Sequence, residues 1–186
     1  MIGYLPKSLT IAGKEIEIRT DYRIALNIFV AYSDPDLSIE EKVEVMLTCL
    51  YKCELKDIPD IQEACKEAVW YLNGGTYEEA PSGPKIMDWE QDEQMIFSAI
   101  NKVANKEIRE ADHIHWWTFL GYFREVDEGL FTTVVNIRRK KAVGKKLEKY
   151  EKEFYEKNSD IVKLKPKYNE KENKQIEEMK KMLRGG

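Results

Sequence analysis

Three cysteines are the residues whose type suits metal binding. Cys49 and Cys53 lie one helical turn apart, and Cys65 lies on the next expected helix, so three thiolates could meet. A structural zinc site uses four ligands, usually at closer spacing. An odd number of cysteines without framework spacing is typical of reduced thiols. We therefore predict neither a metal site nor a disulfide.

Two histidines are the next candidates for a metal ligand or a catalytic base. His113 and His115 are two positions apart, so on a helix they point to different sides and cannot chelate one ion as an i, i+4 pair can. His115 falls on the apolar side of the expected helix. Its predicted role is that of a core histidine held by a hydrogen bond through one ring nitrogen.

Four carboxylates lie close together in the sequence and could form a catalytic cluster: Asp88, Glu90, Asp92 and Glu93. Most of it is explained by the start of a helix, where negative charge is favourable. Asp88 is the expected N-cap, and Gln91 completes a capping box.

Asp92 is the exception in this group, because it lies at the edge of an apolar stripe formed by Trp89 and Ile96. A carboxylate at such a position needs a partner, and Arg23 or His115 could supply one. We find no G-x-G-x-x-G motif, no phosphate-binding loop and no nucleophile beside a base. The sequence therefore predicts no enzyme, no catalytic residue and no cofactor.

The segment 113–123 places five aromatic residues within eleven positions. Asp112 is the expected N-cap of a helix there, and one broad side of that helix is apolar and predicted to be buried. This side holds His115, Trp116, Phe119, Leu120, Tyr122, Phe123 and Val126.

Trp117 projects to the opposite side of this helix. Either the helix is buried nearly all round, or it presents a tryptophan to a partner. Tryptophan is enriched at binding hot spots, and Gly121 one turn later leaves room for another helix to approach. The candidate partner-binding residues here are Trp117, Ile114, Gly121 and Arg124.

The remaining sequence patterns predict a compact, mainly α domain with a short N-terminal β-hairpin. Alternating apolar residues around a glycine turn predict the hairpin at residues 8–19. Capped helices are expected to open at Asp21, Ser38, Asp60 and Asp88, with a loop rich in glycine and proline at 74–85. We expect one helical domain over residues 1–137, followed by a basic, lysine- and glutamate-rich helical tail over 138–186.

Charge separates these two regions. The chain has 30 basic and 34 acidic residues, but residues 138–186 hold 17 basic and 9 acidic, which leaves 13 and 25 for residues 1–137. The body is thus about −12 and the tail about +8, so either the tail folds onto its own body or it binds an acidic partner.

The tail carries only a thin apolar stripe at Leu147, Tyr150 and Phe154, and a last short helix is expected over residues 169–183. Such a stripe cannot fold alone, so it must find a surface on this chain, on a second copy or on a client. We expect a homo-oligomer. The sequence shows no signal peptide and no membrane-spanning run, which favours the cytosol.

Several motifs together resemble the bacteriophage family named for gene product fifteen, found in the tail modules of phages and prophages of low-GC Gram-positive hosts. They include Asp21-Tyr22-Arg23, Leu37-Ser38-x-x-Glu41-Lys42, Asp88-Trp89-x-x-Asp92-x-x-x-Ile96 and His115-Trp116-Trp117-x-Phe119. The resemblance covers nearly the whole chain. In such modules the gene usually lies just before the tape-measure gene, the position typical of tail assembly chaperones.

The resemblance implies a non-enzymatic, mainly helical protein of the host bacterial cytoplasm. Its partners would be the tape-measure protein, which it keeps soluble while the tail tube polymerises, and other tail assembly proteins. Two alternatives stay open. One is a minor structural or tail-completion component of the virion. The other is a nucleic-acid-binding arm at residues 138–184, against which the interleaved acidic residues argue.

Overall fold

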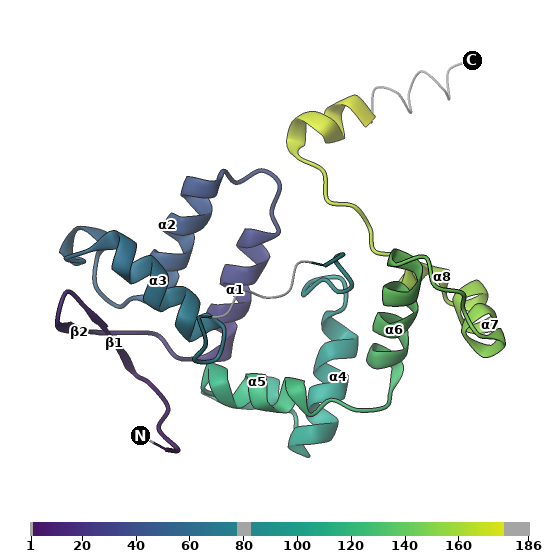
Figure 1. Cartoon of the computed structure of the whole chain (residues 1–186), viewed down its shortest axis with the longest axis horizontal. Coiled ribbons are helices and arrows are strands. Elements are labelled where there is room, and N and C mark those ends of the chain that lie inside the picture. Colours follow the sequence, from purple (N-terminus) through teal and green to yellow (C-terminus); the bar gives the residue numbers. More distant parts are fainter. Residues whose placement is uncertain (1, 78–82, 177–186) are drawn as a thin grey trace.

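The computed structural model describes residues 2–77 and 83–176 (Figure 1). Strands β1 (Ser8–Ile11) and β2 (Lys14–Glu17) pair in antiparallel register, with Leu9 opposite Ile16. The turn between them has positive φ at both Ala12 (48°) and Gly13 (76°), as the twist of a two-residue hairpin requires. The hairpin predicted at 8–19 is confirmed.

Helices α1 (Tyr22–Tyr32), α2 (Ile39–Leu50) and α3 (Ile61–Leu72) begin where the predicted caps place them. Ser38 and Glu41 form a complete capping box, and the Asp60 carboxylate accepts the Glu63 N–H. Glu63 does not complete a second box, because its own carboxylate accepts the Ala12 N–H at 2.6 Å. It therefore ties the hairpin turn to α3.

Helix α4 (Glu93–Ala104) begins later than predicted. The Asp88 carboxylate accepts the N–H groups of Glu90 and Gln91, which makes a turn ahead of the helix, and Asp92 stands at the N-cap. The prediction of Asp88 as N-cap with Gln91 completing a box was therefore wrong by about one helical turn.

Helix α5 (Trp116–Arg124) also begins later than predicted. Its N-cap is His115, whose Nδ1 accepts the Trp117 N–H at 3.1 Å, so the prediction of Asp112 as the cap was wrong. Two short 3-10 turns, η1 (Leu55–Asp57) and η2 (Ile108–Glu110), connect neighbouring helices.

The hairpin and α1–α3 form one side of the molecule, whereas α4 and α6 (Leu130–Ala142) form the other (Figure 1). Helix α5 contacts both α1 and α4. The core where they meet is aromatic: the Tyr22 ring stacks on Phe119 with centroids 4.7 Å apart, and Trp116 stacks on Phe119 at 5.5 Å. The buried aromatic residues of α5 therefore pack between the two sides of the molecule.

The C-terminal tail continues from the body without a break. The boundary expected after residue 137 falls inside α6, and α7 (Lys149–Lys157) and α8 (Ser159–Val162) follow. Leu147 and Phe154 contact a small buried cluster of Val134, Ile137 and Val162, so this chain supplies the surface for the stripe. Residues 170–176 are helical, and the rest of the expected last helix lies outside the described residues.

Candidate functional site

The aromatic motif on α5 is structural. Trp116 is 1% exposed, and its indole N–H donates to the Leu72 carbonyl at 2.9 Å. His115 is buried, with Nε2 2.9 Å from the Pro6 carbonyl. Burial lowers the pKa of His115, although the hydrogen bond to Pro6 opposes that shift. Since Nδ1 accepts a backbone N–H, we assign the neutral tautomer protonated at Nε2.

Trp117 packs against its own chain. Its indole N–H donates to the Tyr71 carbonyl at 2.8 Å, and its ring meets Trp70 edge-on at a centroid distance of 5.3 Å. A Cβ at Gly75 would lie 3.0 Å from the Trp117 ring, and Gly75 also has φ +94°. Helix α3 and the glycine turn after it therefore hold Trp117 in place, and of the two alternatives the helix that is buried nearly all round fits better.

The other residues proposed around Trp117 differ in their accessibility. Ile114 is buried, and its N–H donates to the Asp21 carboxylate at 3.1 Å, so it is not accessible to a partner. Gly121 and Arg124 are exposed. In the tail stripe, Tyr150 is 65% exposed, whereas Leu147 and Phe154 contact the chain itself. The proposed residues thus form no continuous accessible surface.

The partner of Asp92 is Arg138. Asp92 is fully buried, and the Arg138 guanidinium meets it with Nη1 2.5 Å from Oδ2 and Nη2 2.8 Å from Oδ1. Neither partner suggested by the sequence is used, because Arg23 pairs with Asp21 and His115 faces Pro6. The remaining Arg138 donors bind three backbone carbonyls, those of Ile86, Ile161 and Val162.

The neighbouring carboxylates bind the basic tail. Lys167 pairs with Glu90 and with Asp88, and the Gln91 amide bonds the backbone at Lys163 and Lys165. Burial tends to raise the pKa of Asp88, but hydrogen bonds from Lys85 and Gln91 together with the charges of Lys85 and Lys167 lower it to about 2. The carboxylate cluster thus anchors residues 161–167.

The three cysteines are the candidate metal ligands of the sequence. Cys49, Cys53 and Cys65 are free and partly buried. Across residues 2–77 and 83–176, no three His, Cys, Asp or Glu side chains are placed to hold a metal ion. In the same part of the chain no helix has the length and apolar character needed to cross a membrane.

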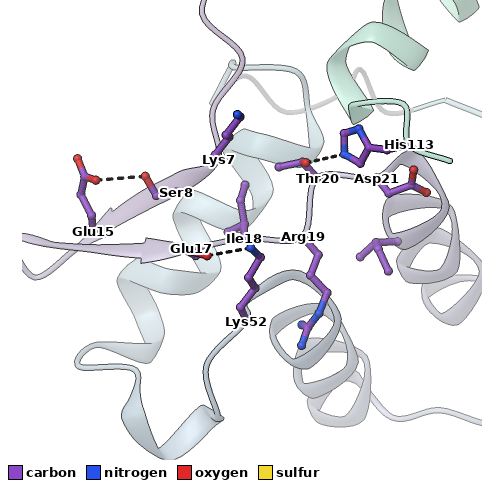
Figure 2. Close-up of a pocket in the computed structure, with 11 residues that line it drawn as sticks. Lys7, Ser8, Glu15, Glu17, Ile18, Arg19, Thr20, Asp21, Lys52 and His113 are labelled. Atoms are coloured by element: carbon purple, nitrogen blue, oxygen red, sulfur yellow. Dashed lines mark hydrogen bonds and ion pairs between the residues drawn. The ribbon is translucent and has the colours of Figure 1, made fainter.

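A hollow of about 760 Å³ lies between the hairpin, α1 and the end of α2 (Figure 2). Some side chains of its lining contact one another: Lys52 pairs with Glu17 at 2.8 Å, and His113 lies 2.9 Å from the Thr20 hydroxyl. Arg19 donates to the carbonyls at the end of α2, including Thr48 and Cys49. Several polar groups that line this hollow are therefore already bonded to groups of the same chain.

A second hollow, of about 470 Å³, has an apolar lining; we call it the α4–α6 groove. Its floor is the face of α4 at Met95, Ala99 and Val103, spaced i, i+4 and i+8. Its wall is the connection from α5 to α6, where Leu130 is 50% exposed. A groove with such a floor fits the apolar face of one helix.

The rim of the α4–α6 groove is acidic. Glu125, Asp127 and Glu128 line it, and none of the three carboxylates makes an ion pair with any residue that the structure describes. Sequence reasoning missed this surface. The apolar stripe named from the sequence in this region is that of Trp89 and Ile96, and neither Val103 nor Leu130 was singled out as a binding residue.

Residues 1–164 match the model of the family described as Bacteriophage Gp15 protein. The comparison with curated proteins finds no similar chain, and neither does the comparison with solved structures. The matched region includes the aromatic motif, the Asp92–Arg138 pair and the α4–α6 groove.

Proposed function

The chain belongs to the Bacteriophage Gp15 protein family, and from that premise we propose that it is a tail assembly chaperone which keeps the tape-measure protein soluble. Membership itself indicates a structural or assembly-related phage protein. The proposal adds the client, the site and the absence of catalysis. The protein would act in the host bacterial cytoplasm, before and during polymerisation of the tail tube.

The α4–α6 groove is the observation that carries the proposal. A tape-measure protein is a very long helix with apolar stretches, which aggregate unless they are covered. The floor at Met95, Ala99 and Val103 offers apolar contacts at helical spacing over about 12 Å, at a rise of about 1.5 Å per residue. One copy would cover one short apolar stretch, so a long client would take up many copies.

The basic tail supports a nucleic-acid-binding role less well. Arg138 is buried against Asp92, Lys140 pairs with Glu151, and Lys167 pairs with Glu90. Cations held in this way are not free to follow a phosphate backbone. Their side chains instead stabilise the fold of the tail on the body.

The test is co-expression with the tape-measure protein of the same phage. The fraction of tape-measure protein that stays soluble should rise when this chain is present, and the two should co-purify. Expression beside an unrelated acidic helical protein is the control. A tape-measure protein that stays in the pellet, together with recovery of this chain from purified virions, would support a minor structural component instead.

A further inference from the structure

We propose that the α4–α6 groove also binds residues 170–184 from a second copy of this chain. The free protein would thus associate head to tail, with the tail segment of one copy in the groove of the next. This inference uses the groove of the proposed function, but it concerns the protein alone and does not require a client.

The first support is the path of the tail. Lys167 pairs with Glu90, and the Glu170 N–H donates to the Asp36 carboxylate, so the segment is anchored at the N-terminal end of α4 and the turn after α1. From there the helix at 170–176 projects away from the body (Figure 1). The groove runs along α4 from Gln94 to Val103 and is bounded by the connection from α5 to α6. The helix at 170–176 does not line the groove of its own chain, which leaves that groove open to a tail segment from another copy.

The second support is the match between the stripe and the floor. In the sequence Ile176, Met179 and Leu183 are spaced i, i+3 and i+7, a spacing that corresponds to about 10 Å along any α-helix. The floor residues Met95 and Val103 are eight positions apart on α4, or about 12 Å. The two apolar stripes have nearly the same length.

The third support is charge. Residues 170–184 carry five basic and four acidic side chains, and on a helical projection Lys180 adjoins the apolar stripe. The groove rim presents Glu125, Asp127 and Glu128 without ion pairs among the described residues. Opposite charges around matching apolar stripes favour this docking over an uncharged partner.

The proposed contact joins two different surfaces, so it is heterologous. Each copy has one tail to donate and one groove to fill, and the assembly either closes as a ring or continues as a chain. A groove filled by a neighbouring tail is also shielded from other apolar surfaces.

The experiment uses two full-length variants with complementary defects. Leu130→Glu places a charge in the groove; Leu130 is the first residue of α6 and half exposed, so a glutamate there suits the helix N-terminus. Met179→Asp with Leu183→Asp places charges on the tail stripe. Ile61→Glu is the matched control, because Ile61 is the first residue of α3 and is 43% exposed.

Light scattering after gel filtration measures the mass of each form. Wild type and Ile61→Glu should associate, both defective variants should be monomers, and an equal mixture of the two should give dimers, since one keeps its groove and the other its tail. Thermal melting checks that each variant is folded. If Leu130→Glu melts at a lower temperature than wild type, a second variant takes its place. This variant, Glu125→Lys with Glu128→Lys, reverses two charges at the groove rim, and both side chains are exposed. A monomeric wild type, defective variants that associate as wild type does, or a mixture that stays monomeric would each overturn the inference.

Discussion

Asp92 and Arg138 form a two-pronged, buried ion pair that links the start of α4 to the last turns of α6. The two residues are 46 positions apart in the sequence. Arg138 also binds the carbonyls of Ile161 and Val162, so one guanidinium connects the body, α6 and the tail segment. Through this contact the pair helps to set how α6 lies against α4, and the groove lies between α4 and the start of α6.

The pair should make a large contribution to stability. Asp92→Ala leaves the Arg138 charge buried without its partner, and we expect the free energy of unfolding to fall by about 3–5 kcal/mol. Urea denaturation measures this loss. Asp112→Ala is the control, because Asp112 is exposed and should change stability by less than about 0.5 kcal/mol. Equal stability of the two variants would show that the pair contributes little.

The two adjacent tryptophans should both stabilise the fold, to different degrees. Trp116→Ala removes a fully buried ring and should cost about 3–5 kcal/mol. Trp117→Ala removes a partly buried ring and its hydrogen bond to Tyr71, and should cost about 1–3 kcal/mol. Denaturant unfolding of both variants measures the two losses. A Trp117→Ala variant with wild-type stability and impaired client binding would restore Trp117 as a partner-binding residue.

Asp88 should make the free energy of unfolding depend on pH in the acid range. Its pKa is lowered from 3.8 to about 2 in the folded chain, so the unfolded chain binds its proton first as pH falls. The contribution is therefore present above about pH 4 and is lost as pH falls toward about 2. Its full size is about 2 kcal/mol, of which about 1 kcal/mol is lost by pH 3.

The measurement compares the free energy of unfolding at about pH 6 and about pH 3. Wild type should lose about 1 kcal/mol more than Asp88→Asn over this interval. Asp112→Asn, which changes an exposed carboxylate, should lose as much free energy of unfolding between these two pH values as wild type does. An equal loss of unfolding free energy in Asp88→Asn and in wild type would contradict the role given to the Lys85 and Lys167 contacts.

Local signals in the sequence predicted the local structure. The hairpin and the starts of α1, α2 and α3 follow from a turn or a cap within a few residues, and each is confirmed. Helix α5 was misplaced because Asp112 and His115 are both able to cap it, and only tertiary contacts choose between them. His115 is fixed by Pro6, which is 109 positions away in the sequence.

Long-range pairing could not be predicted in the same way. The sequence indicated that Asp92 needs a cation, but with 30 basic residues in the chain it did not identify Arg138. The α4–α6 groove was missed for a related reason. Helical periodicity shows that one side of α4 is apolar, but it does not show how much of that side neighbouring elements cover.

We propose that the α4–α6 groove holds the tape-measure protein in solution. The most direct test co-expresses that protein with wild type, with Leu130→Glu or with Ile61→Glu, and measures its soluble fraction after centrifugation. Both variants replace an exposed apolar residue at the first position of a helix, but only Leu130 lines the groove. We predict that Ile61→Glu protects the client as wild type does, whereas Leu130→Glu leaves it in the pellet. A folded Leu130→Glu variant that keeps the client as soluble as wild type does would contradict it.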